Sequence, residues 1–300
     1  MNLAYTMQKF QDWFTQQWVI STGQQFNPFN DNWLIGPFGE LNGIGENFIT
    51  QLAEKENLIV QRNLNSKGLL SSIKELNLND QELKNLSQKV IDFYENTSNY
   101  ELVFDVKWNP FFKPFGFFVN RLFSKRINQL NIPLQNNNQE KLSSEIIQFF
   151  DKITNELKYT IWLRKVENTG QVIYSGIYGI CKLPSNQTCI KAIFPLPKGN
   201  ATVIMKLSVG TNGELILDSS GKKFGDAGFY FLLNDSKNEY WAKFVRSFTD
   251  QLIIQEKQDY LIATQTLKLW NLKVSELNYK INYTQQLKKI PDFQVIESFL

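Results

Sequence analysis

The chain is 300 residues long and 42% hydrophobic, and its 32 basic and 29 acidic residues leave a net charge of only +3. The basic residues are scattered, which argues against the concentrated positive charge that nucleic-acid-binding proteins show. The sequence contains no histidine, which excludes histidine-dependent catalytic triads, histidine-ligated metal centres and histidine general bases. We therefore expect no nucleic-acid partner, no metal and no cofactor, and any catalysis has to use carboxylate, Lys, Arg, Tyr or Cys side chains.

Segment 1–21 has no charged stretch followed by an apolar run, so it does not read as a signal peptide. No window reaches about eighteen uninterrupted apolar residues, the length that a membrane-spanning helix needs. The two cysteines, Cys181 and Cys189, do not make a disulfide framework, and we interpret them as ordinary buried thiols. These features predict a cytoplasmic protein without a transmembrane segment.

Residues 1–133 are predicted to form a mainly helical region. Short helices fit segments 5–20 and 46–56. Segment 79–98 also has helical spacing, with an apolar stripe formed by Leu83, Leu86, Val90 and Phe93.

Two signals for helix starts support this interpretation. Asp80 is placed to cap the first turn of the helix in segment 79–98. Ser72 and Glu75 have the spacing of a capping box, in which each side chain bonds the backbone of the other residue. A further short helix is therefore expected to begin near Ser72.

An early strand interrupts the helical region at residues 100–108. Its apolar side chains alternate with polar ones, which predicts a strand with one buried face; the apolar set is Leu102, Phe104, Val106 and Trp108. Segment 108–126 follows, with one tryptophan and six phenylalanines, and then Lys125 and Arg126. We consider three interpretations for it: a core helix, which is favoured, a lid over a hydrophobic cavity, and an interfacial membrane segment.

Residues 134–144 are rich in Asn and Gln and are predicted to form a polar linker. Residues 145–300 then contain roughly eleven strand-like segments separated by short turns. Because these turns are too short to hold crossover helices, the strands are expected to pair antiparallel, and so many strands in one sheet curl or close. The predicted fold class is α+β, with the helical N-terminal region packed on a large curved antiparallel β-sheet or barrel.

Several of these strands are apolar on both faces, which predicts a cover on each side. In segment 172–181, one face is predicted to hold Val172, Tyr174, Tyr178 and Ile180, and the opposite face Ile173, Ile177 and Cys181. One cover is assigned to the helical region, and the other to a second layer, the far wall of a barrel or a bound apolar molecule. Gly176 and Gly179 mark a bend, tight packing or close approach of another group, and tight packing is favoured over a ligand.

Candidate ligand-binding residues follow from these faces. Arg246 is predicted to share a face with Phe244, and Arg164 lies between Trp162 and Val166 on its own face. If buried, each arginine is expected either to pair with a carboxylate, such as Glu276 or Asp226 for Arg246, or to anchor an acidic head group of a ligand, and the carboxylate pair is favoured. The alternative for Arg246 is that its side chain extends to an edge of the sheet. The other candidates are the pocket residues Tyr174 and Tyr178, the lid residues Phe115 and Phe118, and Asp226 as a weak catalytic candidate.

The layout resembles lipocalin-like and helix-grip ligand-binding folds, an analogy of fold alone. We predict a protein that binds a hydrophobic or amphipathic small molecule, lipid-like, polyketide-like or aromatic, in an apolar pocket of the β-domain. An isomerase or cyclase that uses a carboxylate in the same pocket is the first alternative. The second is a structural or interaction protein without a pocket, and a peripheral contact with a membrane is compatible with each of the three.

Overall fold

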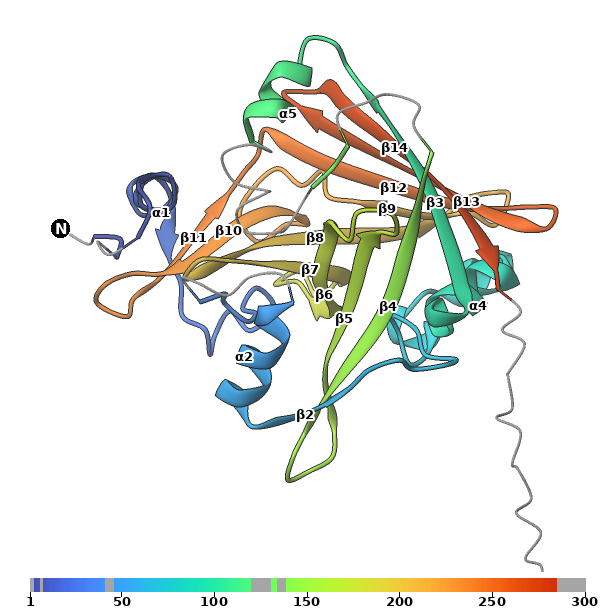
Figure 1. The fold of residues 1–300 in the computed structure, drawn as a ribbon, viewed down its shortest axis with the longest axis horizontal. Coiled ribbons are helices and arrows are strands. Elements are labelled where there is room, and N and C mark those ends of the chain that lie inside the picture. The colour runs from blue at the N-terminus through green and yellow to red at the C-terminus, as the bar shows by residue number, and fades with distance from the viewer. Residues whose placement is uncertain (1–2, 6–7, 41–45, 120–130, 134–138, 285–300) are drawn as a thin grey trace, which may run out of the picture.

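The structure is a computed structural model that describes residues 3–5, 8–40, 46–119, 131–133 and 139–284. Its main feature is a closed antiparallel barrel of ten strands (Figure 1). Around the barrel the strands run in the order β8, β7, β6, β5, β4, β3, β14, β13, β12 and β9, and β9 pairs again with β8. The prediction of an antiparallel barrel with added helices is therefore confirmed.

Nine of the ten barrel strands have nine to twelve residues, and β9 has four. Their bounds are β3 (Tyr100–Trp108), β4 (Glu140–Asp151), β5 (Leu157–Val166), β6 (Val172–Lys182), β7 (Thr188–Leu196), β8 (Gly199–Val209), β9 (Leu215–Asp218), β12 (Phe248–Lys257), β13 (Tyr260–Leu269) and β14 (Leu272–Tyr283). Residues 140–144, predicted as part of a linker, belong to β4, because Leu142 faces the core while its neighbours do not. Residues 134–138 of that predicted linker lie outside the described residues, and the proposed domain division stays a prediction.

A smaller extension of the sheet leaves the barrel at β8. The first half of β8 pairs with β10 (Gly228–Asn234), which pairs with β11 (Tyr240–Phe244) and then β1 (Gln24–Gln25). Helix α1 (Phe10–Thr22) packs against this extension through a small apolar cluster. On the other side of the barrel, β2 (Leu58–Gln61) adds to β4.

The remaining helices cover the barrel in two places. Helix α2 (Asn47–Glu56) packs on the outer faces of β4 to β7. A group of short helices lies across one end of the barrel and contacts strands around the ring; it consists of η1 (Ile73–Leu76), α3 (Asp80–Asn85), α4 (Gln88–Glu95) and η2 (Thr97–Asn99). Helix α5 (Lys113–Val119) follows β3 (Figure 1).

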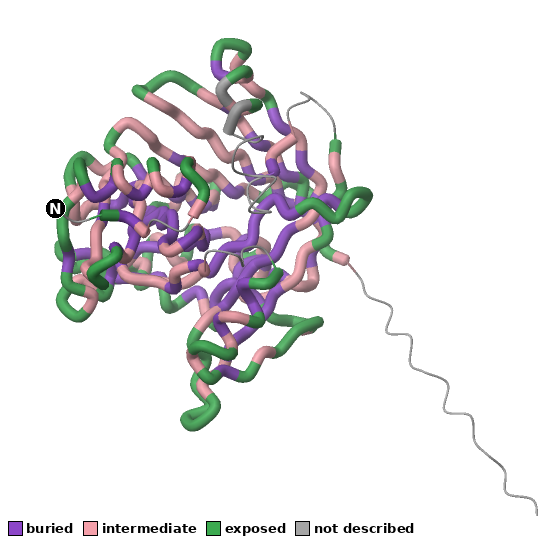
Figure 2. Tube along the Cα trace, turned by 60° about the vertical axis from the view of Figure 1, so that its left-hand side comes forward, coloured by how far each residue is buried: buried purple, intermediate pink, exposed green. Residues whose placement is uncertain are grey.

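Buried residues therefore lie on both sides of the strands between β4 and β8. Figure 2 shows the buried segments concentrated in the strands, whereas the turns are exposed. Inside the barrel, apolar side chains of the strands and of the end helices form one continuous core. The two covers that the sequence predicted for segment 172–180 are the N-terminal segments outside and the opposite wall of the barrel inside.

The helix predicted over segment 79–98 is divided in the structure. Leu86 has extended backbone angles, φ −63° and ψ 130°, and ends α3, and Ser87 then caps α4. The N-cap of α3 is Asn79 and not the predicted Asp80, because the Asn79 side chain accepts the amide of Glu82 at 2.9 Å. The capping box of Ser72 and Glu75 is confirmed, and it starts the 3₁₀ helix η1.

A bulge between β5 and β6 changes the direction of side chains in segment 172–180. Arg164 pairs with Tyr174 and Lys165 pairs with Val172, so Ile173 is an extra residue in β6. As a result Ile173 and Tyr174 both contact the inner core, whereas Val172 packs outside under α2. The prediction that Val172 shares a face with Tyr174 is wrong for this reason, since a bulge shifts the alternation by one residue.

The two glycines of β6 differ in their surroundings, and this difference predicts different effects of substitution. A Cβ atom at Gly176 would lie 2.8 Å from a ring carbon of Phe194, whereas one at Gly179 would meet nothing within 4 Å. Gly176→Ala is expected to lower the free energy of unfolding by about 1–3 kcal/mol through overpacking. Gly179→Ala serves as the control and should be neutral or slightly stabilising. Chemical denaturation of both variants checks this, and equal effects would contradict the inward packing of Gly176.

Candidate functional site

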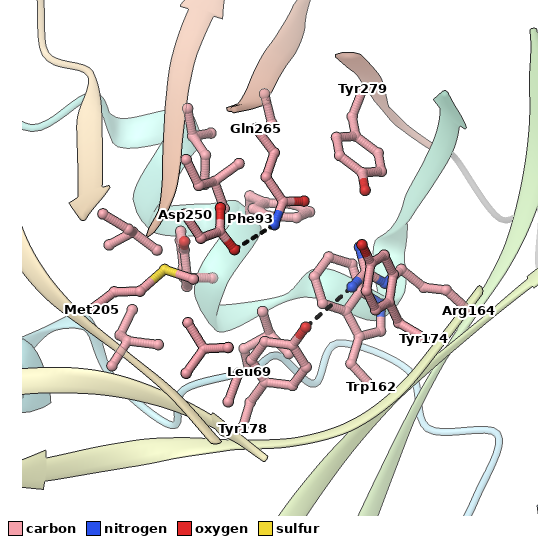
Figure 3. Close-up of a pocket in the computed structure, with 18 of the residues that line it drawn as sticks. Leu69, Phe93, Trp162, Arg164, Tyr174, Tyr178, Met205, Asp250, Gln265 and Tyr279 are labelled. Atoms are coloured by element: carbon pink, nitrogen blue, oxygen red, sulfur yellow. Dashed lines mark hydrogen bonds between the residues drawn. The ribbon is translucent and has the colours of Figure 1, made fainter. Parts of the chain in front are cut away.

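The interior of the barrel contains a cavity of about 80 Å³. Most of its lining is apolar, with contributions from strands around the ring and from Leu69 and Phe93 at the helical end. The polar part of the lining consists of few groups, notably Arg164, Asp250 and Gln265, with several tyrosines (Figure 3). The arrangement is therefore an apolar chamber with a small number of fixed polar groups.

Arg164 lies in the middle of β5 and is buried, with 6% of its surface exposed. Its guanidinium carbon lies 4.0 Å from the ring centroid of Trp162 and 4.4 Å from that of Tyr174, so the charge is stabilised by cation–π contacts. One terminal nitrogen donates to the hydroxyl group of Tyr178 at 3.1 Å (Figure 3), and Nε has no hydrogen-bond partner in the protein. Among the described residues, no acidic side chain forms an ion pair with Arg164.

Tyr279 on β14 faces the same guanidinium group, with 5.9 Å between its ring centroid and the guanidinium carbon. Burial raises the pKa of Tyr279 to about 12, against the lowering effect of the Arg164 charge, so the hydroxyl group stays protonated at neutral pH. This hydroxyl group forms no hydrogen bond of normal geometry within the protein. Arg164 Nε and Tyr279 Oη are therefore buried without a hydrogen-bond partner of normal geometry, while the Arg164 guanidinium group and the Tyr279 hydroxyl group interact with each other electrostatically.

Asp250 on β12 is the acidic group of the cavity. Its Oδ2 atom accepts a hydrogen bond of 2.7 Å from Gln265 Nε2, and its Oδ1 atom is buried without a partner in the protein (Figure 3). Burial raises the pKa of Asp250 to about 7; the bond from Gln265 opposes this shift and the nearby negative charge of Asp218 adds to it. A carboxyl group with such a pKa can donate or accept a proton at neutral pH.

The cationic and the acidic groups lie on opposite walls. In the ring of ten strands, β5 and β12 are five positions apart, through β4, β3, β14 and β13, and so are β6 and β13. Arg164 on β5 therefore faces Asp250 on β12, and Tyr178 on β6 faces Gln265 on β13. Figure 3 shows the Asp250–Gln265 pair on one side of the chamber and Arg164 on the other.

Three of the predicted ligand-binding residues line this cavity: Arg164, Tyr174 and Tyr178. The alternation of β5 predicts the inward direction of Arg164, because Trp162 and Val166 on the same face belong to the inner core. Their association with the cavity is a finding of the structure, whereas their role in binding stays a prediction.

The other predicted site residues lie elsewhere. Arg246 is exposed in the turn between β11 and β12, because the chain turns at Val245 and the strand predicted through it ends at Phe244. Phe244 packs on Tyr230 in the outer cluster, with 5.1 Å between ring centroids. Neither Arg246 nor Phe244 lines the cavity.

Asp226 has a structural role in its turn. One of its carboxylate oxygens accepts the backbone amides of Lys222 and Lys223 at 2.9 and 3.1 Å, outside the cavity. Phe115 and Phe118 belong to α5, and their side chains lie outside the described residues. Of the same segment, Phe111 and Phe117 are exposed at 80% and 47%.

Sequence reasoning missed three polar groups of the cavity: Asp250, Gln265 and Tyr279. A signal for Asp250 is present, since it alternates with Leu252 and Ile254, which also line the cavity. An acidic residue on the apolar face of a strand is the pattern that identifies it. Gln265 and Tyr279 carry no comparable signal, because their strands are joined to the site only by the closure of the barrel.

Other kinds of site find little support in the described part of the chain. No group of three or more Cys, Asp or Glu side chains there could hold a metal ion. Cys181 on β6 and Cys189 on β7 lie opposite each other, and both are free, buried thiols. Burial raises the pKa of Cys181 to about 11. None of the described helices combines the length and the apolar character required to cross a membrane.

The fold and the cavity together define the class of this protein: a closed antiparallel barrel with a largely apolar internal chamber. The chain is 24% identical over 245 residues to a protein of Bacillus subtilis (strain 168) named uncharacterized membrane protein YndJ. The similar region covers 81% of this chain and 42% of that protein, so the chain spans less than half the length of this relative. No known protein family matches the chain, and no solved structure is significantly similar to it.

The raised pKa of Asp250 predicts a specific effect on stability. In the unfolded chain an aspartate titrates near its model value of 3.8, whereas in the folded protein Asp250 titrates at about 7. Between these values the folded state holds one proton more than the unfolded state, so the free energy of unfolding falls as the pH rises from about 4 to 7. Asp250→Asn removes this titration.

The variant is therefore expected to gain stability relative to the unchanged protein as the pH rises, by up to roughly 4 kcal/mol above pH 7. Urea unfolding of both proteins at pH 4.5, 6 and 7.5 measures the difference. Asp226→Asn, on the surface turn, is the control. If the stability difference between Asp250→Asn and the unchanged protein does not vary with pH, the pKa of Asp250 is not raised in the folded protein.

Proposed function

We propose that the barrel binds a hydrophobic or amphipathic small molecule in its internal cavity. The observation that carries this proposal is the chamber of about 80 Å³, with apolar walls and buried polar atoms that have no partner in the protein. An apolar cavity of about 150 Å³ in another protein holds benzene, so a chamber of this size suits a short chain or one end of a longer molecule. Lipid-like, polyketide-like and aromatic molecules share the required apolar part.

The resemblance to lipocalin-like or helix-grip folds also belongs to the proposal. Lipocalins use eight strands around an apolar ligand, whereas this barrel has ten strands and short helices across one end. The shared feature is a barrel interior that residues with alternating direction line. This analogy concerns the architecture and supports a binding role only together with the cavity.

Asp250 favours a second candidate function, an isomerase or cyclase that transfers a proton. A general acid or base needs a pKa near the working pH and a place beside the bound molecule. Asp250 has a pKa of about 7 and presents a free Oδ1 atom to the chamber. In this function Asp250 transfers the proton, and Arg164 on the opposite wall stabilises negative charge on the bound molecule. Asp250 thus replaces Asp226 as the catalytic candidate, because the Asp226 carboxylate binds backbone amides of its own turn.

Helix α1 supports a contact with a membrane surface in addition to ligand binding. Besides the apolar residues Val19 and Ile20, the helix buries Asp12 and Gln16, whereas Phe10 and Phe14 are 72% and 61% exposed. With Trp18, these residues form an aromatic stripe with four-residue spacing on the outer face. Exposed aromatic stripes mark interaction surfaces, and the relative of greater length is named a membrane protein. We propose peripheral attachment through α1, and the cytoplasmic location stays a prediction.

A bound small molecule is expected to accompany the protein during purification. Native mass spectrometry should show a mass adduct that disappears on unfolding, and analysis of the released material should identify an organic molecule with an apolar part. Ala263→Leu fills part of the chamber from β13 and should remove most of the adduct. Thr266→Leu, a substitution on the same strand outside the chamber lining, is the control. Absence of an adduct in the unchanged protein, or an adduct that Ala263→Leu leaves intact, would contradict the proposal.

The aromatic stripe of α1 predicts binding to lipid vesicles. The double variant Phe10→Ser and Phe14→Ser should weaken binding to vesicles of mixed phosphatidylcholine and phosphatidylglycerol by at least roughly tenfold, because two apolar side chains no longer enter the bilayer surface. Co-sedimentation measures the effect. The control is Ile153→Ser, which removes an equally apolar side chain, 89% exposed, from the turn between β4 and β5. If the control weakens binding as much as the double variant, α1 is not the attachment site.

A further inference from the structure

Three buried polar atoms without a partner in the protein meet at one chamber. They are Arg164 Nε, Tyr279 Oη and Asp250 Oδ1, and the side chains that carry them line the cavity. Buried polar groups are normally satisfied, because a donor or acceptor removed from water without a partner destabilises the folded state. A molecule that fits the chamber is therefore expected to carry polar groups that bond to these three atoms.

The cationic wall requires an anion. Arg164 is the only cationic side chain among the described residues of the lining. Its contacts are aromatic rings and one neutral hydroxyl group, and the acidic residue of the chamber lies on the opposite wall. A guanidinium group that is buried without a counter-charge favours binding of a negative group. Because one cation balances one negative charge, a carboxylate fits this wall better than a doubly charged phosphate monoester.

The shape of the wall agrees with a carboxylate. One terminal nitrogen of Arg164 donates to Tyr178, whereas Nε–H is buried without a partner, and the hydroxyl group of Tyr279 is a second donor that faces the same guanidinium group. A carboxylate has two oxygen atoms that can accept these two bonds, and bonds from an arginine to a carboxylate are short and strong. The apolar walls between the two poles then contact the carbon chain.

We propose that the ligand of the barrel is a short amphipathic carboxylate, whose carboxylate group accepts hydrogen bonds from Arg164 and Tyr279 and whose apolar part extends toward Asp250. This refinement rests on the proposed binding function. A hydroxyl or amide group at the far end of the ligand donates to Asp250 Oδ1. The chamber thus binds both ends of one molecule: residues of β5 and β14 bind the anionic end, and Asp250 of β12 binds the polar end.

Ligands with one chain and three head groups test this inference. Hexanoate, hexan-1-ol and hexylammonium have the same chain and differ in charge, and ligand-observed NMR with the 300-residue protein measures their affinities. Hexanoate should bind at least roughly tenfold more tightly than hexan-1-ol, and hexylammonium, which Arg164 repels and for which only Asp250 offers a counter-charge, should bind more weakly than hexanoate. Arg164→Gln should weaken hexanoate by roughly thirtyfold or more and leave hexan-1-ol nearly unchanged. Arg246→Gln, which removes an exposed arginine, is the matched control and should change neither affinity.

A second variant keeps the test decisive if Arg164→Gln does not fold. Tyr279→Phe keeps the ring and removes only the hydroxyl group, and it should weaken hexanoate roughly tenfold without affecting hexan-1-ol. Equal binding of hexanoate and hexan-1-ol would overturn the carboxylate inference and leave the binding function standing. If none of the three ligands binds and native mass spectrometry shows no adduct, both proposals fail, and the polar atoms of the chamber are satisfied by water alone.

Discussion

The pairing of β8 with the short strand β9 closes the barrel, and the character of the interior depends on this closure. Four residue pairs form the ladder, from Lys206 opposite Asp218 to Val209 opposite Leu215. On its other side β9 pairs with β12, and Ser219, directly after β9, exchanges hydrogen bonds with the backbone of Asp250. Without β9, the facing edges of β8 and β12 would be unpaired, and water would reach Asp250. The closure therefore raises the pKa of this carboxyl group.

Covers on both sides of the sheet explain why the strands between β4 and β8 do not alternate simply. Outside, α2 and the segment 26–38 pack on these strands, and inside, the short helices at one end contact the opposite faces. Burial on both faces selects large apolar side chains throughout. The same burial makes Arg164 costly, since a charge loses its hydration there. The rings of Trp162 and Tyr174 offset part of this cost, because cation–π contacts strengthen when water is excluded.

The sequence was informative about the fold wherever local pattern decides structure. Period-two alternation and short turns predicted the antiparallel strands, and the spacing of Ser72 and Glu75 predicted a capping box that the structure contains. Features that depend on neighbouring strands and helices were not predictable from the sequence. The bulge at Ile173 exists only in relation to β5, and at Leu86 the backbone becomes extended before Ser87 caps a second helix. Strand order likewise could not be derived, because the closure by β9 pairs segments with no local signature.

The two arginines that the sequence predicts to bind a ligand lie in different surroundings, and the extent of strand pairing explains the difference. Alternate residues of a strand share a face, and this rule predicts the direction of both Arg164 and Arg246. It holds for Arg164 because β5 is paired on both sides at this point, with Ser144 and Tyr174. It fails for Arg246 because a turn begins at Val245 and ends the ladder before the arginine is reached. Parity predicts direction only while hydrogen-bonded pairing continues, so a buried charge can be inferred from sequence only in the middle of a strand, and its partner across the barrel only from the closed structure.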